Sequence, residues 1–149
     1  MAAADHLCLA LDVASAEDAV AWVRRTRSAF GTYKIGLQAF CAEGPTLLDR
    51  VRAAGAERVF LDLKLHDIPN TVAGAVRSLG ELGVDLLTVH VAGGRVMLEA
   101  ARAAAPSGLQ LVGVTLLTSL DQTLAAEVGL AEAPAALVSR RAALAADCG

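Results

Sequence analysis

Five short apolar runs, separated by helix-like stretches, constrain the fold more than any other feature of this sequence. Four are rich in leucine or β-branched residues and are bounded by turn or cap residues: 7–13, 59–65, 84–91 and 109–117. A weaker fifth run spans residues 33–37. The hydrophobicity of these runs is continuous rather than alternating, which is typical of strands covered on both faces, as in parallel sheets. We therefore predict five parallel strands.

The stretches between and after these runs carry helix signals. Helices are predicted from Ser15, from Pro45 to near Gly55, and at residues 72–82, 96–105, 121–128 and 134–146. Ser15 and Asp18 form a start like a capping box, and Trp22 on this first helix is expected to pack against the sheet. Repeated βα units of this kind predict an α/β fold, either doubly wound or closed into a barrel.

Polar residues at the carboxyl ends of the predicted strands favour the barrel. They are Asp12, Lys34, Asp62, His90 and residues 115–119. In a (β/α)8 TIM-type barrel these ends converge on one mouth, whereas in an open sheet only a switch point gathers them. A complete barrel usually takes more than about 200 residues. We therefore expect one domain over residues 1–149, an incomplete barrel of about five βα units that is truncated before the sixth strand.

Composition excludes several classes of protein. The chain is 55% hydrophobic and 19% charged, which excludes a disordered tail. No apolar run reaches the roughly 18 residues of a membrane helix, and no secretory signal is recognised at the start. A net charge of −3 argues against nucleic-acid binding. The three cysteines lack metal-ligand spacing, are expected to be buried, and suit a reducing compartment, so we expect a cytoplasmic protein.

The segment from residue 60 to 71 carries the most informative polar residues. Along a regular strand Asp62, Lys64 and His66 share one face, and a buried strand has no packing use for such charges. A structural ion pair at the sheet end is the simpler interpretation for Asp62 and Lys64 alone. Because Asp12 and Lys34 end neighbouring strands, four charges of alternating sign meet at one mouth, and a functional site is favoured.

The sequence Asp-Leu-Lys-Leu-His-Asp-Ile-Pro-Asn-Thr, from Asp62 to Thr71, closely resembles the signature of the orotidine 5′-phosphate decarboxylase family. Three further segments resemble the same family: Leu-Ala-Leu-Asp ending at Asp12, residues 33–37 around Lys34, and residues 115–119 ending at Ser119. The resemblance implies a carboxy-lyase that makes UMP from orotidine 5′-phosphate in pyrimidine biosynthesis. It also implies a homodimer that needs no metal and no organic cofactor.

The resemblance assigns four catalytic residues. Lys64 would protonate C6 of the pyrimidine, Asp62 would lie beside the substrate carboxylate, and Lys34 would hold the charges together. Asp67 would reach the site of the partner subunit. Independently of the family, interleaved lysines let crowded carboxylates stay ionised, and an ammonium beside C6 stabilises the developing carbanion.

Substrate binding is implied for four residues as well. Asp12 and Lys34 would contact the ribose, Ser119 would hydrogen-bond the pyrimidine, and Thr71 would reach into the partner's site. Relatives bind the substrate phosphate with residues from their seventh and eighth βα units, and no residue here matches those positions. We therefore expect the chain to be weakly active or inactive on its own.

Two alternatives stay open. The first is a Mg²⁺-dependent sugar-phosphate decarboxylase or synthase of the same superfamily. Members of that branch typically bind the metal with an acidic residue on the second strand, and the second strand here carries Lys34 instead. Residues 68–71 also resemble the nucleotide branch. The second alternative is a non-catalytic fragment or binding module.

Overall fold

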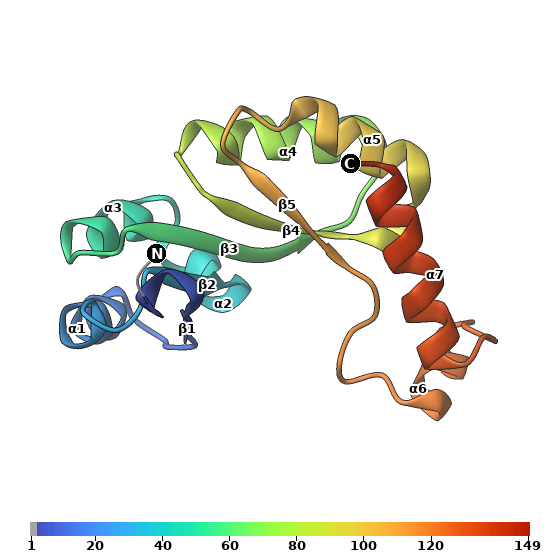
Figure 1. Cartoon of the computed structure of the whole chain (residues 1–149), viewed down its shortest axis with the longest axis horizontal. Coiled ribbons are helices and arrows are strands. Elements are labelled where there is room, and N and C mark those ends of the chain that lie inside the picture. The colour runs from blue at the N-terminus through green and yellow to red at the C-terminus, as the bar shows by residue number, and fades with distance from the viewer. Residues whose placement is uncertain (1–2) are drawn as a thin grey trace. The chain divides into compact units, whose positions relative to one another are not determined.

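Five strands form in the computed structural model, which describes residues 3–149 (Figure 1). They are β1 (Cys8–Leu11), β2 (Thr32–Gly36), β3 (Arg58–Leu65), β4 (Leu86–His90) and β5 (Gln110–Val114). All five predicted strands are confirmed, and most are shorter than the apolar runs that predicted them. Residues 1 and 2, part of the start that was expected to carry no secretory signal, lie outside the described residues.

The sheet follows the order β1-β2-β3-β4-β5. The pairs β1–β2 and β2–β3 are parallel, with Cys8 opposite Thr32 and Thr32 opposite Arg58. In a doubly wound sheet the first strand lies in the interior of the strand order, whereas in a barrel each strand neighbours the next along the chain. The sequential order therefore confirms the predicted barrel-type arrangement of βα units.

Seven α-helices and two short 3-10 helices are found among the described residues. They are η1 (Ala3–His6), α1 (Ala16–Thr26), α2 (Leu37–Glu43), α3 (Thr46–Ala53), α4 (Pro69–Glu81), η2 (Val91–Gly93), α5 (Gly94–Ala104), α6 (Gln122–Glu127) and α7 (Pro134–Asp147). Six of the α-helices match predicted ones. Helix α2 was not predicted: it follows β2 directly, its N-cap residue Gly36 offers no side-chain cap, and it buries only Ala39.

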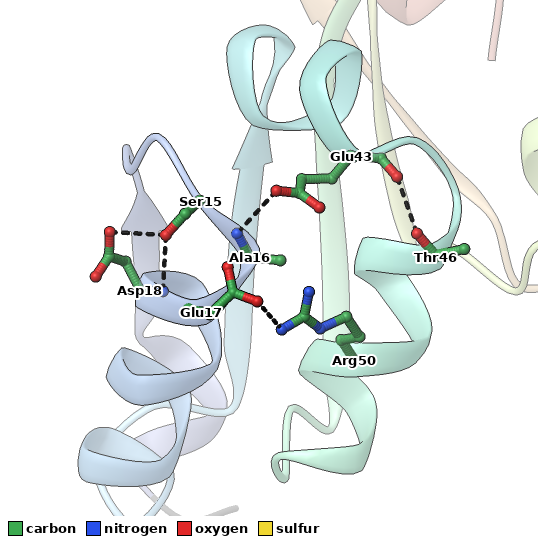
Figure 2. A network of polar contacts seen from close by, with 7 residues as sticks. All are labelled: Ser15, Ala16, Glu17, Asp18, Glu43, Thr46 and Arg50. Atoms are coloured by element: carbon green, nitrogen blue, oxygen red, sulfur yellow. Dashed lines mark hydrogen bonds and ion pairs between the residues drawn. The ribbon is translucent and has the colours of Figure 1, made fainter.

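The amino terminus of α1 is capped from two directions (Figure 2). Ser15 accepts a hydrogen bond from the Asp18 amide at 3.1 Å, as the capping-box pattern predicted, and its hydroxyl donates to the Asp18 carboxylate at 2.8 Å. The Ala16 amide donates to Oε1 of Glu43, the last residue of α2, at 3.2 Å. Carboxylates beside a helix amino terminus satisfy free amides and complement the helix dipole.

The same network joins α1 to α3. Arg50 donates to the Glu17 carboxylate at 2.6 Å, and this hydrogen bond lowers the pKa of Glu17 below its ordinary value (Figure 2). The Thr46 hydroxyl donates to the backbone carbonyl of Glu43 at 2.9 Å. The turn that follows β1 is therefore held by residues of the two helices that follow β2.

The chain divides into two compact units, and β3, β4 and β5 each run from the first into the second. The first unit holds the chain up to Leu63 with residues 78–87 and 106–110, and the second holds residues 64–77, 88–105 and 111–149. Each unit has its own buried side chains. Among them are Tyr33, Ile35, Leu47, Leu48, Val51 and Leu61 in the first, and Val72, Val76, Val89, Met97, Ala101 and Leu137 in the second.

Two expectations about burial are wrong. Trp22 is 44% exposed, because α1 buries the stripe of Ala16, Ala19 and Val23, and the Arg25 guanidinium lies 5.2 Å from the indole centroid. All three cysteines are free, two of them are exposed and the third is partly exposed. Within the described range, no helix combines the length and the apolar character that crossing a membrane requires.

Asp85, which directly precedes β4, forms hydrogen bonds with residues at the starts of β3 and β5 in the first unit. Its Oδ2 accepts from the Val59 amide at 2.8 Å, and its own amide donates to the Val59 carbonyl at 3.0 Å. Its carbonyl accepts from the Gln110 amide at 2.9 Å. Val59 is fully buried, so its amide needs a partner within the protein.

We predict that Asp85→Ala lowers the free energy of unfolding by about 1–3 kcal/mol, because the Val59 amide loses its acceptor. Asp85→Asn is the matched control, since it keeps an acceptor oxygen and loses only a half-exposed ion pair with Arg58 at 3.9 Å. Urea unfolding followed by circular dichroism measures both. Equal losses in the two variants would contradict this role for the carboxylate oxygen.

Candidate active site

The ammonium of Lys34 lies between two carboxylates in the first unit. Its Nζ is 3.6 Å from Oδ1 of Asp12 and 3.4 Å from Oδ2 of Asp62, to which it donates a hydrogen bond. Asp12 directly follows β1, Lys34 lies in β2 and Asp62 lies in β3. The parallel register explains the meeting, because Leu11 pairs with Ile35 and Gly36 pairs with Asp62. Three of the predicted site residues are therefore brought together.

The two ion pairs differ in their exposure to water. The side chains of Lys34 and Asp62 are 22% and 16% exposed, whereas that of Asp12 is 75% exposed. A pair of unit charges 4 Å apart gains about 4 kcal/mol at an effective dielectric constant near 20, before desolvation is subtracted. Water screens the Asp12 pair, so it contributes at most about 1 kcal/mol. The pair of Lys34 and Asp62 is the stronger one.

Strand β2 fixes the direction of Lys34. Its neighbours Tyr33 and Ile35 are both fully buried, and side chains alternate between the faces of a strand. With those two side chains anchored in the core, Lys34 must lie on the opposite face, towards Asp12 and Asp62. The ammonium is therefore held by packing as well as by charge.

Lys64 has an unusual backbone conformation. Its φ is 54°, and it is the one non-glycine residue with positive φ in the described part of the chain. Burial alternates along β3 from Arg58 to Asp62 and then stops alternating. The predicted sharing of one face by Asp62, Lys64 and His66 assumed a regular strand, and a left-handed residue ends that regularity. The Lys64 amide donates to the Thr88 hydroxyl at 2.8 Å.

The remaining predicted residues lie on exposed segments of the second unit. Asp67 follows β3, and its Oδ1 accepts a hydrogen bond from the Ile68 amide at 2.6 Å. Thr71 lies in the first turn of α4, and Ser119 lies between β5 and α6. All three side chains are accessible to a ligand or to another protein chain.

Four residues of the second unit were not predicted as part of a site: Thr88, which contacts Lys64, and His66, His90 and Arg141. Thr88 is buried, and a threonine within an otherwise apolar strand is only a weak sequence indication of a functional residue. Nothing in the sequence around Arg141 indicated a functional role. Arg141 donates to the Thr115 carbonyl at 2.6 Å, where the segment that carries Ser119 begins. The rings of His66 and His90 are 5.3 Å apart. Burial, reinforced by the charges of His66, Lys64 and Arg141, lowers the pKa of His90, so its imidazole is neutral at pH 7.

The side chains that converge in the first unit carry one positive and two negative charges. Within the described residues no three histidine, cysteine or acidic side chains are grouped as metal ligands. The two carboxylates that do converge already share a lysine ammonium. Such an arrangement can accept hydrogen bonds from hydroxyl groups through its carboxylates.

Comparison with known proteins gives a consistent result. The chain is 46% identical to orotidine 5′-phosphate decarboxylase of Nitrosospira multiformis over 145 residues, covering 97% of this chain and 60% of that protein. It is 46% identical to orotidine 5′-phosphate decarboxylase of Anaeromyxobacter sp. over 149 residues, covering 100% and 65%. The chain thus spans less than two thirds of the length of these relatives.

Solved structures agree with the sequence comparison. The crystal structure of orotidine 5′-phosphate decarboxylase from Lactobacillus acidophilus is similar with a TM-score of 0.83 at 31% identity, covering 96% of this chain and 67% of that one. A conserved protein from Geobacillus kaustophilus gives a TM-score of 0.83 at 38% identity, covering 95% and 69%. These similarities support the expected fold, an incomplete barrel of the TIM type.

The family model described as orotidine 5′-phosphate decarboxylase / HUMPS matches residues 5–149. That match covers nearly the whole sequence, including β1 to β3 with their three charged side chains. The chain therefore belongs to the orotidine 5′-phosphate decarboxylase / HUMPS family.

Proposed function

We propose that this chain decarboxylates orotidine 5′-phosphate to UMP, a step of pyrimidine biosynthesis, without a metal or an organic cofactor. The observation that carries the proposal is the contact of the Lys34 ammonium with both Asp12 and Asp62. Similarity to the orotidine 5′-phosphate decarboxylases of Nitrosospira multiformis and Anaeromyxobacter sp. supports the choice of substrate.

In this proposal the first unit holds the ribose and the reacting carboxylate. The exposed carboxylate of Asp12 accepts hydrogen bonds from ribose hydroxyl groups, and Lys34 donates to the ribose. Asp62 lies beside the substrate carboxylate. Because Lys34 neutralises part of the charge around Asp62, that side chain can stay ionised next to another anion.

The chemical step breaks the bond between C6 and the carboxylate carbon. Carbon dioxide leaves, and the electron pair of the broken bond stays on C6. Lys64 then transfers a proton from its ammonium to C6, which leaves a neutral amine and gives UMP. Loss of neutral CO₂ relieves the repulsion from Asp62 while the carbanion gains a nearby cation, so the interactions improve towards the transition state.

We also propose that the working form is a homodimer in which each chain completes the other's site. Asp67 and Thr71 would reach into the partner's site, and Ser119 would bind the pyrimidine within its own chain. The exposure of this segment supports the proposal, since Ile68 is 67% exposed beside Asp67.

A Mg²⁺-dependent reaction on a sugar phosphate is the weaker alternative. A divalent cation needs several oxygen ligands, and here a lysine ammonium lies within 3.6 Å of both converging carboxylates. Magnesium would have to displace that ammonium. The charge arrangement therefore favours the nucleotide substrate.

Replacing Lys64 tests the proposed chemistry. We expect the 149-residue chain to form UMP from orotidine 5′-phosphate only slowly, because no phosphate-binding residue is recognised in it. We expect Lys64→Ala to lower that kcat further, by at least about 100-fold, because the general acid is lost. Loss of ultraviolet absorbance follows the reaction, and chromatography identifies UMP. Arg77→Ala removes an exposed charge from α4 and should leave kcat unchanged. No UMP from the unmodified chain, or an undiminished rate in Lys64→Ala, would overturn the proposed function.

Mixing two inactive variants tests the shared site. A hybrid dimer of Lys64→Ala and Asp67→Ala chains has one site with both residues intact, so an equal mixture should recover about a quarter of the unmodified activity. The rate is measured after the two chains are unfolded together and refolded. A mixture no more active than the average of the separate variants would show that Asp67 acts within its own chain.

A further inference from the structure

The backbone of Lys64 is held in a conformation that lysine rarely adopts. At φ 54° the residue lies in the left-handed region, where the Cβ atom of an L-amino acid is crowded by backbone. Such residues persist only where the surrounding structure enforces them, and they occur often at functional sites. The neighbouring residues must therefore supply a contact that favours this conformation.

Thr88 of β4 supplies that contact. Its Oγ1 accepts a hydrogen bond from the Lys64 amide at 2.8 Å, and the residue is only 3% exposed. Leu87 and Val89, on either side of it, are 0% and 2% exposed, so this part of β4 is anchored in the core. The branched side chain of threonine also has few rotamers. The hydroxyl is therefore a fixed acceptor.

We propose that Thr88 is a positioning residue for Lys64: its buried hydroxyl holds the left-handed backbone that directs the Lys64 ammonium to the substrate. The proposal rests on the proposed function for its effect on catalysis. Its structural part, that Thr88 holds the backbone of Lys64, stands independently of any activity. Thr88 itself touches the amide of Lys64 and takes no part in the transfer of the proton.

Two consequences follow for the reaction. Loss of the hydroxyl frees the Lys64 backbone to relax, and the ammonium then spends less time at the distance needed for proton transfer. A misplacement of about 1 Å can cost up to about 100-fold in rate. Because Asp12 and Lys34 still bind the ribose, we expect kcat to fall and KM to change little.

The amino-acid composition makes the backbone part directly measurable. Lys34 and Lys64 are the only two lysines in the sequence. Protein labelled with ¹⁵N-lysine therefore gives two backbone amide signals in a proton–nitrogen correlation spectrum. Lys64→Arg removes one of them and so assigns both. The chemical shift and the hydrogen-exchange rate of the Lys64 amide report on its hydrogen bond.

Four variants of two buried threonines give the test. Thr88→Val has nearly the shape of threonine without the acceptor, and Thr88→Ala lacks the acceptor with a smaller side chain. Thr88→Ser keeps the hydroxyl. The matched control is Thr32→Val, because Thr32 of β2 is the other buried polar residue of the described chain, at 7% exposure.

We expect the Lys64 amide to exchange roughly two- to tenfold faster in Thr88→Val and Thr88→Ala. Its proton signal should also move upfield, while the Lys34 amide keeps its shift. Decarboxylation should show a kcat between about 10- and 100-fold lower in both variants, with KM within about twofold. Thr88→Ser should restore the exchange rate and most of kcat, and Thr32→Val should change neither.

The outcomes separate this proposal from the proposed function. The proposal is overturned if Thr88→Val leaves the exchange rate and the chemical shift of the Lys64 amide unchanged. It is also overturned if these change in Thr88→Val but kcat does not fall. If the unmodified chain forms no UMP, the proposed function fails. The exchange rates then still decide whether Thr88 holds the backbone of Lys64.

Discussion

One ammonium group shared by two carboxylates organises the carboxyl ends of the first three strands. Without Lys34, the carboxylates of Asp12 and Asp62, on either side of β2, would have no ammonium between them. The lysine reaches this place because Tyr33 and Ile35 are buried on the other face of β2. The burial of Tyr33 and Ile35 and the position of Lys34 between two carboxylates therefore both follow from the alternation of side chains along β2.

Much of this could be predicted from the sequence, because the determining signals are local. Continuous apolar runs located all five strands, and the capping pattern at Ser15 located the start of α1. The approach of Asp12, Lys34 and Asp62 follows from a geometric rule. Parallel strands present their carboxyl ends at one edge, so residues near the carboxyl ends of three adjacent strands become neighbours.

What could not be predicted depends on contacts between distant residues. Helix α2 directly follows β2, and its N-cap residue Gly36 has no side chain that could indicate a helix start in the sequence. Trp22 is exposed because small residues form the buried stripe of α1, which hydrophobicity alone does not reveal. The left-handed backbone of Lys64 depends on a hydroxyl from β4, 24 positions along the chain. Local sequence favours an ordinary strand there, and a tertiary contact overrides it.

The carboxylate of Glu43 has a consequence for ligand affinity. It accepts a hydrogen bond from the Ala16 amide (Figure 2). This bond constrains the short connection between β1 and α1, which begins at Asp12. A tethered connection loses its conformational freedom when the chain folds, so a ligand that meets Asp12 does not have to order it. The backbone next to the exposed carboxylate of Asp12 is therefore already ordered before any ligand arrives.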